Sequence, residues 1–190
     1  MVTYTINIFR DKWLDLPPLW TRNSCESKIN ISKKPTNAIL KLNIKEVGWY
    51  DIYGGKHVED SLINKWLSVE VNGQPVIDIR PSIRSGETYS ANITAYLNAP
   101  YDDTFRVFIG VEYGWVESVR VYVIFDMWIE AEYPEGEEAP EVIVKSEFGG
   151  SGQSVDNIIL LIIALIQNLP YILLMILLMK VMFTLFSGED

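Results

Sequence analysis

The chain has 190 residues, a formal net charge of −9 and no evident cluster of Lys or Arg. This balance disfavours binding to the phosphate backbones of nucleic acid. Its one cysteine, Cys25, excludes an internal disulfide framework, and its one histidine, His57, excludes sites that need paired histidines. The part before the apolar C-terminal run is long enough for one domain with a core of its own.

Apolar and polar residues alternate repeatedly along residues 1–133, as in strands that bury one face. The alternation covers residues 2–9, 37–46, 66–72, 75–79, 88–97, 104–112 and 118–132. Asn72 and Gly73 stand between two of these segments and predict a tight hairpin turn, because both residues tolerate positive φ. The sequence therefore predicts a mainly β head over residues 1–133, and more specifically an antiparallel jelly-roll β-sandwich.

Two long connections, residues 10–28 and 47–65, are expected between these strands. Flat aromatic side chains beside carboxylates and amides suit the stacking of sugar rings. The candidate ligand-binding residues lie in the second connection and in a later turn, and they are Trp49, Tyr50, Tyr53, Tyr113 and Trp115. The alternative interpretation is that the tryptophans close the ends of the core, as large aromatic residues often do.

Other polar groups carry weaker signals. Asp102 and Asp103, with Asn98 and Tyr101 nearby, supply too few oxygens for a calcium site, so an ordinary turn is expected. His57 lies near acidic residues, but no nucleophile or oxyanion motif accompanies it. We therefore predict a protein that is not an enzyme, with no catalytic residue, no metal ion and no cofactor.

Two Asn-X-Ser/Thr sequons give candidate glycosylation sites at Asn30 and Asn92. The alternation over residues 88–97 places Asn92 on the polar face of its predicted strand. A glycan is accessible there if the head is displayed outside a cell.

The composition changes after residue 133. Residues 134–156 are acidic and rich in Pro, Gly and Ser, which predicts a flexible linker. Residues 157–187 are almost wholly apolar and carry one charge, Lys180. This run predicts a hydrophobic transmembrane or membrane-inserted helix.

Polar residues interrupt the middle of the apolar run. Pro170 cannot donate a backbone hydrogen bond, so we expect a kink near residues 167–170. Gln167 and Asn168 are suited to hydrogen bonding across helices, which favours self-association through this segment. The alternative is a tilted monomeric anchor that tolerates both amides.

Three short motifs lie at the ends of predicted strands. One strand ends with Val71-Asn72-Gly73, another ends with Asn92 to Leu97, and the next begins with Phe105-Arg106-Val107. In these places the stretch 66–111 resembles the jelly-roll sugar-binding-type modules found beside the catalytic domains of glycoside hydrolase family 2. The resemblance implies a fold and no activity. Asn92 stands where those modules usually have aspartate, and no catalytic domain follows.

The layout of a small β-sandwich before a C-terminal apolar helix is similar to minor structural or tail-end proteins of membrane-containing, spindle-shaped archaeal viruses. The resemblance implies a membrane-anchored structural protein that assembles with itself into a ring, vertex or tail-end structure. Its partners would be other copies, the lipid membrane and other virion proteins, and its place a virion envelope or cell membrane. Two alternatives stay open: an anchored adhesin that binds glycans, and a cellular tail-anchored subunit of a membrane complex.

Overall fold

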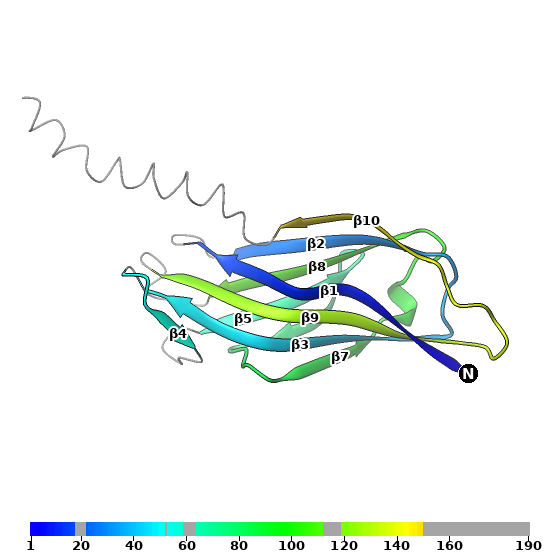
Figure 1. Cartoon of the computed structure of the whole chain (residues 1–190), viewed down its shortest axis with the longest axis horizontal. Helices are drawn as coiled ribbons and strands as arrows, with labels where there is room; N and C mark the ends of the chain where they lie inside the picture. Colours follow the sequence, from blue (N-terminus) through cyan, green and yellow to red (C-terminus); the bar gives the residue numbers. More distant parts are fainter. Residues whose placement is uncertain (18–21, 52, 59–63, 112–118, 150–190) are drawn as a thin grey trace, which may run out of the picture. The chain divides into compact units, whose positions relative to one another are not determined.

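The computed structural model describes residues 1–17, 22–51, 53–58, 64–111 and 119–149. This part of the chain is mainly β, and its ten strands form two antiparallel sheets of five strands each (Figure 1). One compact unit runs from Met1 to Ser151 and contains the whole core of the described residues. Residues 1–151 are therefore expected to fold without the C-terminal segment.

The first sheet, called the β3 sheet here, has a long central strand that pairs on both sides. β3 pairs along its length with β9, which pairs in turn with β1. The other edge of β3 pairs with β7 near its start and with β4 near its end. The strands of this sheet are β1 (Val2–Leu16), β3 (Asn37–Tyr50), β4 (Lys56–Val58), β7 (Thr88–Asn92) and β9 (Arg120–Tyr133).

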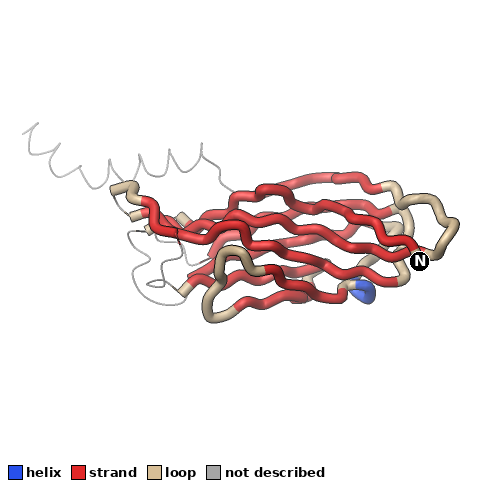
Figure 2. The backbone as a smooth tube through the Cα atoms, turned by 60° about the horizontal axis from the view of Figure 1, so that its bottom comes forward, coloured by secondary structure: helices blue, strands red, loops and turns tan. Residues whose placement is uncertain are grey.

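The second sheet, called the β8 sheet here, has the order β10-β2-β8-β5-β6. One turn of 3₁₀ helix, η1 (Thr94–Tyr96), follows β7 and appears in blue in Figure 2. The strands of this sheet are β2 (Arg22–Ile31), β5 (Lys65–Val71), β6 (Gln74–Ile79), β8 (Asp102–Val111) and β10 (Val142–Gly149).

The predicted alternation matches the buried faces of the strands. On β9 the side chains of Val121, Val123, Phe125, Met127 and Ile129 are fully or almost fully buried. They pack in one hydrophobic cluster with inward residues of β3, β5 and β8. All seven segments that show the alternation lie on or overlap strands, so the two sheets form a β-sandwich with one core.

The predicted hairpin turn at Asn72 and Gly73 is confirmed. Val71 of β5 pairs with Gln74 of β6, so the two residues between them form the whole turn. Both have positive φ, 52° for Asn72 and 79° for Gly73. This is the backbone that a type I′ hairpin requires.

The expectation of a long loop is wrong for most of residues 10–28, and in residues 47–65 it is wrong for 47–50, 56–58 and 65, which lie in strands. β1 continues to Leu16, β2 begins at Arg22, and β3 continues to Tyr50. Register shifts in β1, before and after Phe9, change which face each residue takes. Because a bulge interrupts the period of two, the alternation stops at Phe9 although the strand does not.

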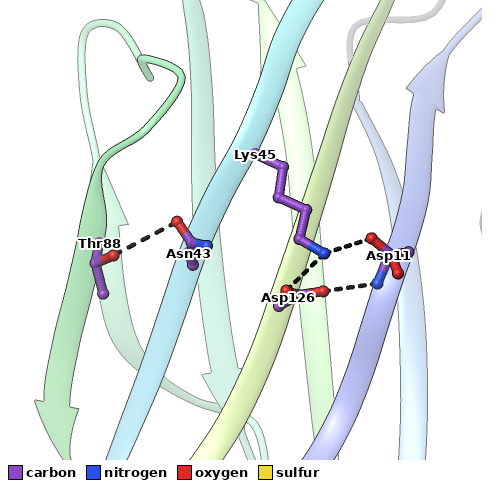
Figure 3. A network of polar contacts seen from close by, with 5 residues as sticks. All are labelled: Asp11, Asn43, Lys45, Thr88 and Asp126. Atoms are coloured by element: carbon purple, nitrogen blue, oxygen red, sulfur yellow. Dashed lines mark hydrogen bonds and ion pairs between the residues drawn. The ribbon is translucent and has the colours of Figure 1, made fainter.

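A polar network on the outer face of the β3 sheet lies beside this irregular part of β1 (Figure 3). The Lys45 ammonium pairs with Asp11 and, at 2.7 Å, with Asp126 Oδ2. The backbone N–H of Asp11 donates to Asp126 Oδ1 at 2.7 Å, and Asp11 has a φ of 48°. The Lys45 pairing lowers the pKa of the Asp11 carboxyl. Three strands are thus joined where β1 leaves regular pairing.

The expectation of a flexible linker over residues 134–156 is wrong for residues 142–149. These residues form β10, which pairs antiparallel with β2 from Ile31 to Cys25. Residues 142–144 are three apolar residues in succession, so they show no alternation, and this edge strand is largely exposed on both faces. The head therefore extends beyond the predicted boundary at residue 133.

The predicted C-terminal helix, its kink and the residues Gln167, Asn168 and Pro170 lie outside the described residues. Among the residues that the structure does describe, no helix has the length and apolar character needed to cross a membrane.

Candidate functional site

The sequence-predicted aromatic site is divided by the fold. Trp49 and Tyr50 are neighbours on β3, so their side chains point to opposite faces of the sheet. Trp49 packs against the hydrophobic core, whereas Tyr50 joins rings on the outer face. Tyr53 is 90% exposed in the turn that follows. Tyr113 and Trp115 lie outside the described residues.

Trp49 closes one end of the core together with His57. Its ring stacks on the His57 imidazole with centroids 4.0 Å apart. His57 Nε2 lies 3.1 Å from Asp51 Oδ2, and the other oxygen of Asp51 accepts hydrogen bonds from the backbone N–H of Tyr53 and Gly55. The His57 hydrogen bond and these backbone donors lower the pKa of the Asp51 carboxyl. The arrangement supports the interpretation of Trp49 as a core residue.

A second group of rings covers the outer face of the β3 sheet. Trp13 stacks flat on Tyr122, with centroids 4.5 Å apart and planes 5° from parallel, and Tyr50 lies 5.2 Å from Tyr122. Gly48 faces Tyr122 across the β3–β9 pair. A Cβ atom at Gly48 would lie 2.7 Å from the Tyr122 hydroxyl oxygen and closer still to the His57 carbonyl. Glycine is therefore what allows the Tyr122 ring to lie across β3.

The Tyr122 hydroxyl group contacts an ion pair formed by Glu46 and Lys56. It donates to Glu46 Oε1 at 2.6 Å, and Lys56 Nζ lies 2.7 Å from the same oxygen. Burial, and then the bond to Glu46, raises the pKa of Tyr122. Lys56 and then Tyr122 lower the pKa of Glu46. Sequence reasoning missed this cluster, because Trp13, Glu46 and Tyr122 meet only through strand pairing.

A polar group closes the opposite end of the sandwich around Asn72. Its Nδ2 donates to the Tyr96 carbonyl and to Asp103 Oδ1, each at 2.7 Å, and its Oδ1 accepts from the Thr104 N–H at 2.8 Å. Asp103 Oδ1 also accepts from the Asn98 N–H at 2.7 Å. Asp103 Oδ2 is buried with no hydrogen-bond partner among the described residues. Burial raises the pKa of Asp103.

Asp103→Asn should raise the free energy of unfolding above that of the native chain at pH 7, and this advantage should be smaller at pH 3. Because burial raises the pKa of Asp103 in the fold, the native state keeps a proton that the unfolded state loses as the pH rises above the ordinary aspartate pKa of about 4. The native contribution therefore falls as pH rises through that window. We expect the variant to gain free energy of unfolding over the native chain at pH 7 and to lose that gain near pH 3, as measured by urea unfolding. An equal difference at both pH values would contradict this.

Asp102 and Asp103, the weak cation candidate, do not act together. Asp102 is on the outer side, 3.4 Å from Lys28 Nζ, and Asp103 is buried. No group of three or more His, Cys, Asp or Glu side chains within the described ranges is placed to hold a metal ion.

The two sequons have different environments. Asn30 Nδ2 donates to the Pro100 carbonyl at 2.8 Å and lies 3.2 Å from Asp102 Oδ1. Asn92 is exposed, and its Oδ1 accepts from the N–H and the hydroxyl group of Thr94, the first residue of the turn η1. The Asn92-Ile93-Thr94 motif thus has a structural role in the turn, and glycosylation remains a prediction.

A cationic surface on the β8 sheet was not predicted from the sequence. Trp66 and Phe108 are on its outer face but are only 8% and 9% exposed. The Arg22 guanidinium lies 3.7 Å from the Phe108 centroid, and the Arg80 guanidinium lies 4.4 Å from the Trp66 centroid. Gly110 lies opposite Trp66, and a Cβ atom there would collide with the Trp66 ring. These residues come from three strands, β2, β5 and β8, and from the residue that follows β6, so no local motif reveals them.

β10 exposes three large apolar side chains. Ile143 is 41% exposed, Val144 is 55% exposed and Phe148 is 64% exposed. The strand is at the edge of the β8 sheet, where Lys12 of β1 pairs with Glu147 at 2.6 Å. Exposed apolar residues on an edge strand are typical of a contact surface.

Comparison with protein families and with curated proteins finds no match. Among solved structures, the SUMO E3 ligase SIZ2 of S. cerevisiae aligns with a TM-score of 0.32 and 18% identity, over 70% of this chain and 52% of that one. The acetyl xylan esterase Est2A of Butyrivibrio proteoclasticus aligns with a TM-score of 0.34 and 13% identity, over 77% of this chain and 34% of that one. The chain therefore spans about half or less of each of these structures.

Proposed function

We propose that this chain is a non-enzymatic structural protein that a C-terminal helix anchors in a membrane, where its copies assemble. The apolar sequence of residues 157–187, with Lys180 as its single charge, carries the proposal. As a helix of about 30 residues it would be about 45 Å long, more than the roughly 30 Å hydrocarbon core of a bilayer. Gln167 and Asn168 would then hydrogen-bond between copies in the apolar phase.

The surface of β10 supports a position close to the membrane. Its exposed side chains Ile143, Val144 and Phe148 belong to the strand that comes last before the apolar run. From Gly149 to Asn157 the chain can reach at most about 28 Å. A lipid surface or a neighbouring copy can therefore cover these three side chains.

The setting that we propose is a virion of a membrane-containing archaeal virus. There the head, as a jelly roll, would belong to a ring at a vertex or tail end and would contact other virion proteins. The support is the layout of the chain: a β-sandwich with one core, followed by an apolar segment. In this setting the protein would be in the virion envelope or, before assembly, in the cell membrane.

Replacing Gln167 and Asn168 together with leucine tests assembly through the C-terminal segment. We expect the oligomer in detergent to dissociate, because the interhelical hydrogen bonds are lost while the apolar length is kept. Thr184→Leu, which replaces a polar residue far from the middle of the segment, is the control and should leave the mass unchanged. Sedimentation equilibrium of the full chain gives the mass. An unchanged mass for the double variant would contradict assembly through these amides.

Glycan binding by the head is the second candidate, and the Trp13 stack favours it. Trp13 is only partly buried and lies parallel to Tyr122, with Lys56 5.5 Å from the centre of the Tyr122 ring. A flat, partly exposed indole beside polar groups suits a sugar ring. Glycan-array binding by residues 1–151 that Trp13→Ala abolishes would support this function, and no binding to any glycan would argue against it.

A further inference from the structure

Two arginine side chains share one aromatic surface on the β8 sheet. We name this surface the arginine platform and define it by Arg22, Trp66, Arg80 and Phe108. The Arg22 guanidinium lies 3.7 Å from the Phe108 centroid and 5.8 Å from the Trp66 centroid, and that of Arg80 lies 4.4 Å from the Trp66 centroid. The rings hold both cations at the surface, where their N–H groups can reach a ligand.

The charges around the platform are unevenly compensated. Arg106, which lies 5.8 Å from the Phe108 centroid, pairs with Glu26, and Arg80 Nε is 2.9 Å from Asp78 Oδ1. In the described part of the chain, the contacts of the Arg22 guanidinium are with the two rings. Like charges close together on a sheet are unfavourable unless an anion joins them. A carboxylate of a second molecule that reached Arg22 would receive charge-assisted hydrogen bonds from its guanidinium group.

The same chain carries a matching anionic surface in the connection from β9 to β10. We name it the acidic segment and define it as residues 134–141, with Glu135, Glu137, Glu138 and Glu141 exposed. Glu137 lies 4.0 Å from Lys33 Nζ, and the backbone of Glu141 exchanges hydrogen bonds with Ser32. Gly136 within it has a φ of 88°, a backbone conformation that favours glycine.

The acidic segment and the arginine platform lie at opposite ends of the sandwich. β10 begins at Val142, which pairs with Ile31 at the end of β2, while Arg22 is at the start of β2. At 3.3 Å per residue the two ends of β2 are about 30 Å apart. Figure 1 shows the connection from β9 to β10 at the end where the N-terminus lies, away from the start of β2. A contact between the two surfaces must therefore join different molecules.

We propose that the arginine platform of one copy binds the acidic segment of a second copy, so that heads join head to tail. This inference rests on the proposed self-assembly and specifies its head contact. An interface between two different surfaces is heterologous, and repeated rotation by such a contact closes a ring or extends a filament. Because both surfaces are exposed and charged, the contact should weaken as salt rises.

The test uses residues 1–151 at low ionic strength and two double variants. One variant replaces Arg22 and Arg80 with Gln, and the other replaces Glu135 and Glu138 with Gln. We expect the native fragment to form oligomers that grow with concentration and dissociate in 0.5 M salt. Each double variant alone should remain monomeric. An equimolar mixture should form dimers only, because one intact platform then meets one intact acidic segment.

The control variant, Arg10→Gln with Arg84→Gln, removes two positive charges elsewhere and should associate as the native fragment does. Unchanged association of either double variant, or oligomers in the mixture larger than dimers, would overturn the inference. If the arginine variant stays monomeric while the glutamate variant still associates, the inference is also overturned, because the arginine platform would then bind an anion other than the acidic segment. The full chain in detergent separates the two proposals: an oligomer that persists in both double variants leaves tail-driven assembly intact and removes only the head contact.

Discussion

Asn72→Ala is expected to lower the free energy of unfolding by about 4 kcal/mol. The substitution removes three side-chain hydrogen bonds, to Tyr96, Asp103 and Thr104. Each is worth about 1 kcal/mol, and the buried Asp103 carboxyl group loses one of its two donors. Alanine also takes the φ of 52° at this position with a further cost of about 1 kcal/mol.

Urea unfolding of residues 1–151, followed by far-UV circular dichroism, measures the loss. Asn98→Ala is the matched control. Asn98 is exposed, and only its backbone takes part in the hydrogen bonds of the Asn72 group. We expect the control to stay within about 0.5 kcal/mol of the native protein. Equal, small effects of both substitutions would show that the Asn72 side chain does not hold this end of the sandwich.

Gly48→Ala is expected to destabilise the head by about 3 kcal/mol, although alanine normally stabilises a strand relative to glycine. The new methyl group would lie 2.7 Å from the Tyr122 hydroxyl oxygen and would collide with the His57 carbonyl. The carbonyl belongs to β4, whose backbone cannot move without losing its pairing with β3. The cost therefore includes displacement of Tyr122 from Glu46 and loosening of β4.

Gly136→Ala is the control variant, because it adds backbone strain without a steric collision. Gly136 has a φ of 88° and open space around its Cα atom, so its substitution carries only the left-handed penalty of about 1 kcal/mol. Chemical unfolding of both variants, with Trp fluorescence as the signal, compares the two costs. If Gly48→Ala lowers the free energy of unfolding no more than Gly136→Ala does, Tyr122 does not approach β3 as closely as the structure shows.

Some strands could be predicted from the sequence because their inward residues are large and apolar. β3 and β9 alternate cleanly, and Asn72-Gly73 marks the hairpin between β5 and β6. The first half of β2 was not predicted from the sequence, because the small or polar residues Cys25 and Ser27 are buried on its inner face. Small or polar inward residues do not raise the apolar signal that period-two patterning detects.

The site residues were harder to predict, because strand pairing joins residues that are far apart in the sequence. The neighbours Trp49 and Tyr50 suggested one aromatic surface, but a strand turns adjacent side chains to opposite faces. Trp13 and Tyr122, by contrast, meet across the β1–β9 pair. Arg22 and Trp66 likewise meet only because both strands flank β8. No spacing along the chain encodes such contacts.

The central claim is that the C-terminal apolar segment holds copies of this protein together in a membrane. Light scattering of the full chain in detergent, beside residues 1–151 at physiological salt, tests it most directly. We predict a defined oligomer for the full chain and a mass close to the monomer for the fragment, whose head contact is screened at this ionic strength. Monomers of both, or the same oligomer with and without the segment, would contradict the claim.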